Sequence, residues 1–474
     1  MNILFAASEL SPLAKTGGLG DVMAALPATL RDRGHSVSIV LPFYRIIREQ
    51  WPDLRTTPVK LTIKLGTAEL TANVWETATP HGVRVYLIER DEFFDRSHLY
   101  GTETGDYADN ASRFIFFAKA VVELARYINP VPQIIHSHDW EAGLIPALVR
   151  AGKHPYRTVY TIHNLAYQGS FWSFDFDLTN LPREYFSPPG VEFYGRLNLM
   201  KAGIVLAHQV TTVSPRYAQE IQTWHFGCSL ESVLSGHKHK LTGILNGVDD
   251  RLWDPQTDHR LVANYSADDL KGKAACKQDI LKKFGLAPTD APLFAVISRL
   301  TSQKGLDLLL ASMRDLLKHD IRFILLGSGD ALYQDRFLRL AHEHTAKVAV
   351  KIGYDESLAH QIEAGADFFL MPSHFEPCGL NQLYSLRYGA IPIVHDTGGL
   401  ADSVEHYDEK SGHGTGFKFS PFGRDPFHAA VNAALHVYKN KKKLDALRRH
   451  AMKKVFSWDL SAAAYEKVYK LALK

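Results

Sequence analysis

The 474-residue sequence predicts an α/β protein of two doubly wound domains, each with a parallel sheet covered by helices on both faces. Short continuous runs of Val, Ile, Leu and Phe recur, each run ends in a polar or glycine-rich turn, and a helical pattern follows each turn. Such runs are typical of parallel strands buried on both faces. They lie at 2–7, 36–41, 83–88, 133–137, 157–162 and 209–213, and again at 293–298, 321–326, 347–351, 367–371 and 391–395.

A segment rich in Asn, Gly, Asp and Pro, at 241–255, separates the two sets of runs. We therefore expect an N-terminal domain over 1–242 and a C-terminal domain over 243–455. The last stretch, 456–474, has the pattern of an amphipathic helix. We expect this helix to pack back on the N-terminal domain.

The composition is that of an ordinary globular protein, with 46% hydrophobic and 22% charged residues. The formal net charge of +3 is spread along the chain, which gives no reason to expect a nucleic-acid partner. Three cysteines suit a reducing compartment, and no signal peptide or run of about 20 apolar residues is visible. We expect a cytoplasmic protein that binds no membrane; the sequence carries no signal for an oligomeric state.

The loops directly after the apolar runs are the candidate sites, because ligands of open α/β sheets bind beyond the carboxyl ends of the strands. The first such loop places Gly17 and Gly18 ahead of a helix whose free N–H groups could bind an anion, with Lys15 as a point charge. Its spacing is neither a P-loop nor GxGxxG, which disfavours a nicotinamide cofactor. By spacing alone, anion binding and a plain glycine-rich turn with a solvated lysine are equally good interpretations.

Two later loops of the first half carry histidines. His136 and His138 point to one face of a strand and could ligate a metal with Asp139, but no third ligand at suitable spacing is evident. Histidines satisfied by hydrogen bonds are the better interpretation. Asp139 followed by Trp140 also fits a sugar site, where a carboxylate binds hydroxyls and an indole stacks on a ring. The next loop offers further hydrogen-bonding groups at His163, Asn164 and Tyr167.

The second half holds two cations next to a predicted helix start. Arg299 follows its strand, and Lys304 lies just before a helix. Two cations with a helix N-terminus can bind a diphosphate. The alternative, a surface Arg and Lys, is weakened because no acidic residue follows them before Asp307.

Two further strand ends of the second half carry chemistry. Glu376, in "FEPCGL", lies at a strand-to-helix crossover after a buried run. Thr397 with the Gly398–Gly399 backbone follows the next run and forms a second turn that can accept a phosphate.

Seven stretches, taken in order, resemble the family of bacterial glycogen synthases and plant starch synthases: KTGGLGDV, HSHDW, YTIHNLAYQG, NGVDDRLWDP, SRLTSQKGLDLL, EPCGLNQLYSLRYG and IPIVHDTGGL. The resemblance runs from residue 1 to about 460 and implies two facing Rossmann-like domains, the GT-B fold, with a catalytic cleft between them. It implies retaining transfer of glucose from ADP-glucose to the non-reducing-end 4-hydroxyl of an α-1,4-glucan such as glycogen. The residues by themselves do not distinguish ADP from UDP.

The resemblance also implies site residues. Lys15 and the glycine turn contact the donor, Asp139 and His163 line the glucosyl pocket, and Arg299 with Lys304 holds the diphosphate. Glu376 is the essential carboxylate, and Cys378 lies beside the donor site as a neighbour rather than a nucleophile. The implied catalytic residues are Asp139, His163, Arg299, Lys304 and Glu376. The implied substrate-binding residues are Lys15, Gly17, Gly18, Asn246, Cys378, Gly379, Leu380, Thr397, Gly398 and Gly399.

Elementary chemistry agrees with these roles. The charge on departing ADP can be neutralised by Arg299, Lys304 and helix N-termini, and no Asp-X-Asp follows a strand end, so we expect neither a metal nor a cofactor. A carboxylate at Glu376 can stabilise a cationic anomeric carbon or bind sugar hydroxyls. Retention through a covalent intermediate and attack on the leaving-group face both remain open; the family favours the second.

Two positions bear on the comparison with the family pattern. His374 stands where the family usually has Arg or Lys, which we expect to leave catalysis intact. Tyr384 stands where related nucleotide-sugar transferases often have a second Glu, which matches the synthase pattern.

Three rival functions are weaker. The first is another enzyme, either a different GT-B transferase or a glucan phosphorylase; a phosphorylase needs a pyridoxal-phosphate lysine pocket in a far longer chain. A non-catalytic glucan-binding module would not need two phosphate-binding clamps, and a nicotinamide oxidoreductase would need the missing fingerprint. Two facing domains also imply closure about hinges, which we expect near 243–250 and 455–460.

Overall fold

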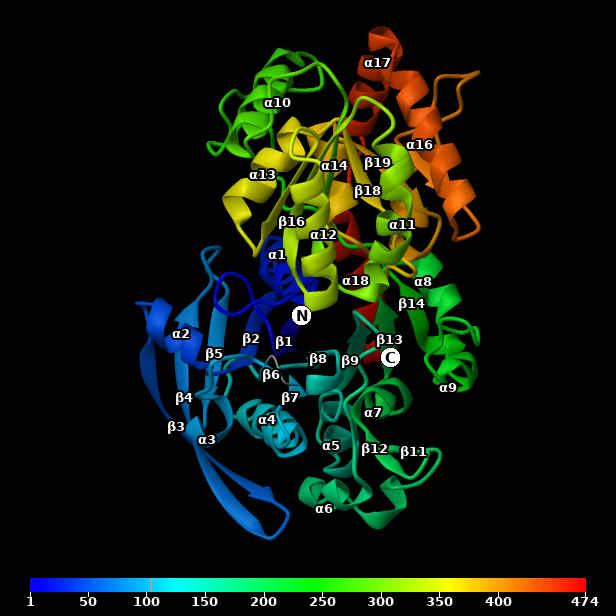
Figure 1. Cartoon of the computed structure of the whole chain (residues 1–474). Helices are drawn as coiled ribbons and strands as arrows, with labels where there is room; N and C mark the ends of the chain where they lie inside the picture. Colours follow the sequence, from blue (N-terminus) through cyan, green and yellow to red (C-terminus); the bar gives the residue numbers. More distant parts are fainter. Residues whose placement is uncertain (103–104) are drawn as a thin grey trace. The chain divides into compact units, whose positions relative to one another are not determined.

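The structure, a computed structural model, describes residues 1–102 and 105–474 (Figure 1). The chain forms two compact units. Met1–Asn246 and Trp458–Lys474 make up the first, and Gly247–Ser457 makes up the second. The chain therefore crosses between the units after Asn246 and after Ser457, within the two stretches where the sequence predicts hinges.

The described residues of the first unit form a nine-stranded sheet that is parallel except at one edge. Its strands, in spatial order, are β14 (Leu241–Gly243), β13 (Gln209–Thr212), β9 (Arg157–Ile162), β8 (Ile134–His138), β1 (Asn2–Ala6), β2 (Ser36–Pro42), β5 (Arg84–Glu89), β4 (Ala68–Ala78) and β3 (Arg55–Leu65). The last two form an antiparallel hairpin that the sequence did not predict. Exposed and buried residues alternate along β3, because an edge hairpin buries only one face, so it lacks a continuous apolar run.

Helices and small sheets complete the first unit. The helices are α1 (Gly18–Asp32), α2 (Arg45–Gln50), α3 (Asp91–Phe94), α4 (Asn110–Leu124), α5 (Ile145–Ala151), α6 (Phe176–Thr179), α7 (Leu199–Leu206), α8 (Pro215–Glu220), α9 (Glu231–Gly236) and α18 (Trp458–Leu473). One small sheet joins β10 (Ser170–Phe171), β12 (Arg196–Asn198) and β11 (Glu192–Phe193), and another joins β6 (Gly101–Thr102) and β7 (Gly105–Asp106).

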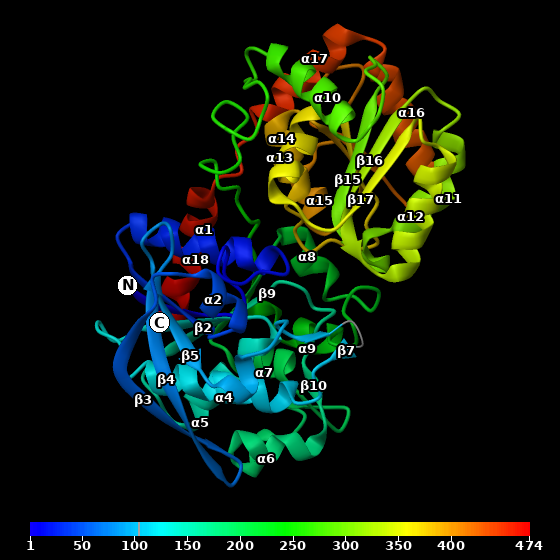
Figure 2. The ribbon, with the colours of Figure 1, turned by 60° about the vertical axis from the view of Figure 1, so that its left-hand side comes forward.

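The terminal helix α18 belongs to the first unit and packs against α1 (Figure 2). Glu466 of α18 accepts two hydrogen bonds from the guanidinium of Arg33, at 2.8 and 3.0 Å. Tyr469 lies 2.9 Å from Nδ1 of His136, a buried residue of β8. The helix α18 is therefore held by an ion pair with Arg33 and by a buried hydrogen bond to a strand of the sheet.

The second unit, all of whose residues are described, has a six-stranded parallel sheet. Its strands, in spatial order, are β17 (Val348–Ile352), β16 (Arg322–Gly329), β15 (Leu293–Leu300), β18 (Phe368–Met371), β19 (Ile391–His395) and β20 (Phe417–Phe419). Its helices are α10 (Lys271–Lys283), α11 (Leu306–Leu316), α12 (Ala331–Glu343), α13 (Glu356–Gly365), α14 (Asn381–Tyr388), α15 (Gly398–Ser403), α16 (Arg424–Tyr438) and α17 (Lys441–Met452).

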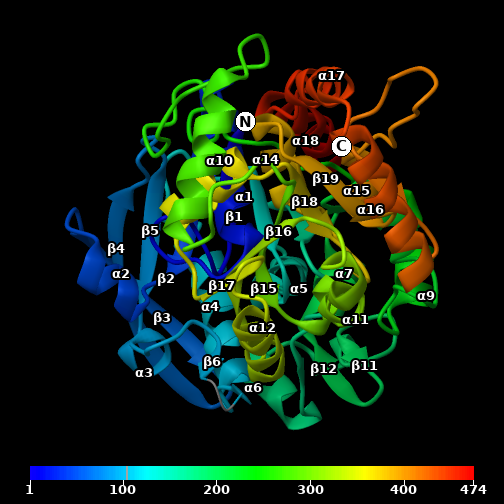
Figure 3. The same cartoon turned by 45° about the horizontal axis from the view of Figure 1, so that its top comes forward.

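Both faces of this second sheet are buried. Along β15, Phe294 and Val296 belong to one apolar core, whereas Ala295 and Ile297 belong to the other, as the alternation of side chains in a strand requires. Residues of α11, α16 and α17 fill the first core, and residues of α10, α13 and α14 fill the second. Figure 2 shows α10, α13 and α14 on one side of the strands, and Figure 3 shows α16 and α17 on the other.

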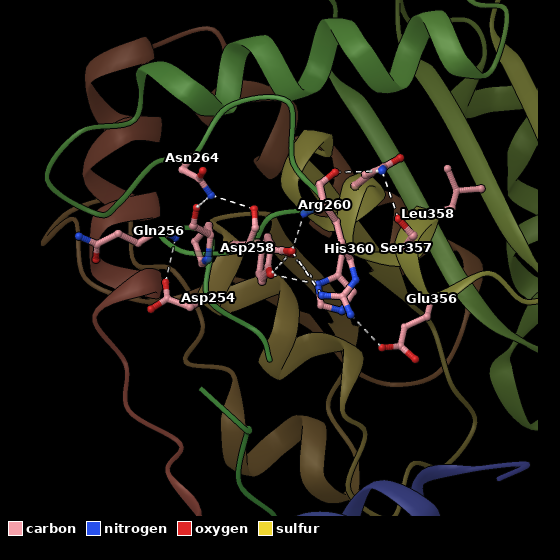
Figure 4. A network of polar contacts seen from close by, with 12 residues as sticks. Asp254, Gln256, Asp258, Arg260, Asn264, Glu356, Ser357, Leu358 and His360 are labelled. Atoms are coloured by element: carbon pink, nitrogen blue, oxygen red, sulfur yellow. Dashed lines mark hydrogen bonds and ion pairs between the residues drawn. The ribbon is translucent and has the colours of Figure 1, made fainter. Parts of the chain in front are cut away.

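The segment that opens the second unit is fixed on α13 and α14 by a buried network (Figure 4). Oδ2 of Asp258 lies 2.7 Å from Nδ1 of His360 and accepts a hydrogen bond of 2.7 Å from Tyr388. Trp253 stacks between His360 and Tyr384, with ring centroids 3.6 and 3.8 Å apart. Since Tyr384 and Tyr388 both belong to α14, this helix is anchored along the face turned to the crossing segment.

No helix among residues 1–102 and 105–474 is long and apolar enough to cross a membrane.

Candidate active site

The glycine-rich loop after β1 is organised by a buried carboxylate, Glu9, which is 4% exposed. Oε2 of Glu9 accepts hydrogen bonds from the backbone N–H groups of Thr16 (2.8 Å) and Gly17 (3.0 Å). Oε1 accepts from the Thr16 hydroxyl at 2.5 Å and from the Tyr100 hydroxyl at 2.9 Å. Charge-assisted bonds of this kind fix the path of the loop into α1.

Lys15 of the same loop is paired with Asp21 in the first turn of α1, at 2.6 Å. Because Glu9 already occupies the N–H of Gly17, an anion at this helix terminus would bind the N–H groups from Gly18 onward. Glu9 was not predicted from the sequence as a site residue. An acidic residue three positions beyond the end of a strand was the available signal.

Asp139 and His163 follow the adjacent strands β8 and β9 and touch each other. Oδ1 of Asp139 accepts hydrogen bonds from the backbone N–H of His163 at 2.7 Å and of Asn164 at 3.4 Å. Asp139 has φ 53°, a left-handed conformation that L-residues rarely adopt and that is enriched at functional sites. Burial raises the pKa of Asp139 to about 7, and burial lowers the pKa of His163 to about 3, so the imidazole is neutral.

A row of histidines backs this pair. Nδ1 of His138 lies 2.9 Å from Nε2 of His163, and Nε2 of His136 lies 2.6 Å from the Thr161 hydroxyl. With Tyr469 on its other nitrogen, His136 has both ring nitrogens in hydrogen bonds and neither left for a metal. Among the described residues, no group of three or more His, Cys, Asp or Glu side chains is placed so that it could hold a metal ion.

In the second unit the structure brings together two residues that the sequence placed on separate loops. Nζ of Lys304 lies 2.6 Å from Oε2 of Glu376. The same carboxylate oxygen accepts a hydrogen bond of 3.0 Å from the Ser373 hydroxyl. Glu376 is 5% exposed and the Lys304 side chain 18%, so the pair is largely shielded from water.

A glycine lets these two loops approach. Gly305 follows Lys304 with φ +64°, and a Cβ built on it would lie 1.8 Å from the carbonyl oxygen of Pro372. Beside it, the backbone N–H of His374 donates to the carbonyl of Gln303 at 2.9 Å. Lys304 reaches Glu376 because the two backbones are in contact here.

The Thr397–Gly399 turn packs directly on the loop that carries Glu376. The N–H of Gly399 donates to the carbonyl of Glu376 at 3.0 Å. A Cβ on Gly398 would lie 1.9 Å from that carbonyl oxygen, and one on Gly399 would lie 2.1 Å from the carbonyl oxygen of Cys378. The glycines are therefore required for the contact between the loops, a reason that the spacing did not reveal.

The remaining predicted residues take separate positions. Arg299 is exposed near the end of β15 and forms no ion pair within residues 1–102 and 105–474. Asn246 is buried at the end of the first unit's main segment, and its Oδ1 has no partner among the described residues. Gly379 and Leu380 lead into α14.

His374 and Tyr384, the two positions compared with the family pattern, each pack against neighbouring side chains. The His374 ring lies 3.4 Å from Asp307 and stacks on Phe422, with ring centroids 3.9 Å apart. Tyr384 is packed in the core against Trp253, so its role in the structure is packing.

Residues 2–236 match the family model described as the starch synthase catalytic domain, and residues 277–453 match that of glycosyl transferases group 1. The glycogen synthase of Koribacter versatilis is 44% identical over 100% of this chain and 98% of its own length. The chain belongs to the glycogen and starch synthase family. A second member, from an Anaeromyxobacter species, is 46% identical over 99% of each chain.

Solved structures agree with this family assignment and with a GT-B fold. The catalytic domain of starch synthase IV from Arabidopsis thaliana, bound to ADP and acarbose, superposes with a TM-score of 0.93 at 34% identity, covering 100% of this chain and 99% of that one. The sucrose-phosphate synthase of Thermosynechococcus elongatus, at 17% identity and a TM-score of 0.63, shares the fold. The predicted fold class and family are thus confirmed.

Proposed function

We propose that this protein is a retaining hexosyltransferase that transfers glucose from ADP-glucose to the non-reducing-end 4-hydroxyl of an α-1,4-glucan and so elongates glycogen. The family supports the reaction class, and the relatives named glycogen synthase support the product. The observation that supports the assignment to particular residues is the shielded Lys304–Glu376 pair. The pair lies beside the Thr397–Gly399 turn, where α15 begins.

The second unit supplies the donor chemistry in this proposal. Departure of ADP leaves negative charge on its distal phosphate. Arg299 is unpaired among the described residues, and Lys304 is held by a carboxylate that can release it to a phosphate. Arg299 is the second-last residue of β15, and Lys304 lies in the connection between β15 and α11, so one strand end and its loop bring two cations to one diphosphate.

Glu376 acts on the sugar in this proposal. A carboxylate close to the anomeric carbon stabilises the positive charge that develops as the C–O bond to phosphate breaks. Its second role follows from the ion pair: when Lys304 turns to the phosphate, the carboxylate gains freedom to accept hydrogen bonds from sugar hydroxyls.

The first unit supplies polar groups for the glucosyl unit. Asp139 accepts from backbone N–H groups and, when ionised, has lone pairs left for hydroxyl groups. The neutral imidazole of His163 can donate or accept without introducing a positive charge beside an oxocarbenium-like sugar. Lys15 and the turn from Gly18 would contact the donor.

One experiment tests the proposal. Purified protein is incubated with glycogen and either ADP-glucose or UDP-glucose, and release of nucleoside diphosphate and growth of the glucan are measured. Growth with ADP-glucose at a higher rate than with UDP-glucose is expected. Glycogen binding with no growth from either donor would instead indicate a non-catalytic glucan-binding protein.

A further inference from the structure

The loop that carries Glu376 continues into α14, and the second residue of that helix, Gln382, is fully buried at 0% exposure. Its Nε2 donates toward the carbonyl oxygens of Cys378 at 2.9 Å and Gly379 at 3.0 Å. These carbonyls belong to the loop itself. Gln382 therefore binds the backbone between Glu376 and the helix, although its side chain is not part of the site described above.

The same amide reaches the end of the neighbouring helix, α15. Nε2 of Gln382 lies 3.1 Å from the hydroxyl of Ser403, which ends α15. That hydroxyl donates to the carbonyl of Gly399 at 2.6 Å, and the N–H of Gly399 donates to the carbonyl of Glu376 at 3.0 Å. The contacts form a closed circuit that joins the loop of Glu376 to the Thr397–Gly399 turn: Gln382 binds the loop directly and reaches the turn through the Ser403 hydroxyl.

The amide has one tolerable orientation. Nε2 faces two carbonyl oxygens and a hydroxyl, so exchanging the two ends of the amide would place Oε1 against the carbonyl oxygens. In the orientation present, Oε1 of Gln382 is buried with no partner among the described residues. A buried acceptor without a partner is unfavourable. We explain its presence here by the other end of the amide, because Nε2 is needed as the donor to the loop and to Ser403.

Close backbone contacts surround the Gln382 amide. Gly379 has φ +72°, and a Cβ on it would lie 2.3 Å from Oε1 of Gln382. Together with the close approaches at Gly398 and Gly399, this means that the two loops and the amide pack as one body.

We propose that Gln382 is a positioning residue for the transfer reaction: it holds the backbone of Glu376 and the Thr397–Gly399 turn in fixed register, so that the carboxylate and the turn address the same sugar diphosphate. This inference rests on the proposed function for its effect on turnover, but its structural part, the locked register of the two loops, can be measured without turnover.

The test uses Gln382→Met, which keeps the length of the side chain and removes the donor, and Ser403→Ala, which removes one arm of the circuit. Ser385→Ala is the matched control, because Ser385 is buried on the same helix and its hydroxyl bonds to Glu363 and to the carbonyl of Asn381, the first residue of α14. Melting temperature, kcat and KM for ADP-glucose, and hydrogen exchange of the backbone amides are measured for each full-length variant.

Gln382→Met is expected to lower kcat about 10–100-fold, with a smaller change in KM, because misplacement of a reacting group by about 1 Å costs up to about 100-fold. Ser403→Ala is expected to have a smaller effect in the same direction, and Ser385→Ala to change kcat less than twofold. Exchange of the Gly399 amide is expected to accelerate in the first two variants and not in the control.

The outcomes separate the two proposals. A folded Gln382→Met protein with normal kcat and normal exchange at Gly399 would overturn the positioning role. If Gln382→Met does not fold, Ser403→Ala decides by the same two measurements. If the wild-type protein turns over no nucleotide sugar, the proposed function fails. Faster exchange at Gly399 in the Gln382 and Ser403 variants than in the wild type would still support the locked register, and unchanged exchange would refute it.

Discussion

The ammonium of Lys304 and the carboxylate of Glu376 form a direct ion pair at 2.6 Å, although 72 positions separate them in the sequence. Each is surrounded by groups that hold it in place: Ser373 donates to the carboxylate, and the backbone at Gly305 lies against Pro372. The pair couples a residue expected to bind phosphate with a residue expected to act on the sugar, and several predictions depend on it.

Replacing Glu376 by Ala is expected to abolish most turnover while ADP still binds, because the nucleotide contacts are assigned to other residues. Turnover is measured by ADP release and ADP binding by titration calorimetry. Glu409→Gln, at an exposed carboxylate that pairs with Lys443, is the control. Near-normal turnover of the Glu376 variant would remove this residue from the mechanism.

Replacing Lys304 by Ala is expected to reduce kcat/KM for ADP-glucose by about 10–150-fold, since one charged hydrogen bond contributes about 1.5–3 kcal/mol. The same variant leaves Glu376 buried without its cation, so a lower melting temperature is also expected. Steady-state kinetics and thermal unfolding together test both effects. An unchanged kcat/KM would show that the phosphate lies elsewhere.

The pKa of Asp139, raised by burial to about 7, predicts a pH dependence of activity. The ionised carboxylate has more lone pairs for sugar hydroxyls, so kcat/KM is expected to rise with pH through about 7. Asp139→Asn should be less active and should lose this limb of the profile. A wild-type profile that is flat between pH 6 and 8 would contradict the assignment.

The contact between Arg33 and Glu466 predicts an acid-sensitive attachment of α18. Hydrogen bonding to Arg33 lowers the pKa of Glu466 from 4.5 to about 2, so the ionised form is favoured in the folded state. The stabilisation is present above about pH 4.5 and is lost as the pH falls towards 2. Glu466→Gln should melt below the wild type at pH 7, and the difference should narrow as the pH is lowered to 3; a constant difference would refute this.

A pair of glycine variants tests the close approach of the loops beside Lys304. Gly305 and Gly412 both have left-handed φ, +64° and +72°, but only Gly305 lies against another backbone. Gly412→Ala is expected to cost about 1 kcal/mol for its conformation alone. Gly305→Ala should cost about 1–3 kcal/mol more than Gly412→Ala, because its Cβ would clash with the carbonyl oxygen of Pro372. Equal free energies of unfolding for the two variants would contradict the close packing of Gly305 on Pro372.

Local pattern was sufficient for most of the fold. Every apolar run quoted from the sequence coincides with a strand of one of the two large sheets, because parallel strands buried on both faces need continuous apolar sequence. The hairpin β3–β4 was missed because its alternating pattern belongs to an edge with one exposed face. The terminal helix was predicted from its periodicity, and it packs against α1, the helix between β1 and β2.

The sequence by itself determined the residue types at each strand end, and the ordered motifs determined the family, since both are local properties of the chain. Only the tertiary structure decided which of these groups meet. That Lys304 pairs with Glu376, that Glu9 holds the Gly17 loop, and that Gln382 joins two turns all depend on distances across the sheet edge. The first of these contacts joins loops 72 positions apart, whereas the other two are made between residues closer in the chain. All three depend on the path that the backbone takes beyond the strand ends, which the residue types alone do not encode.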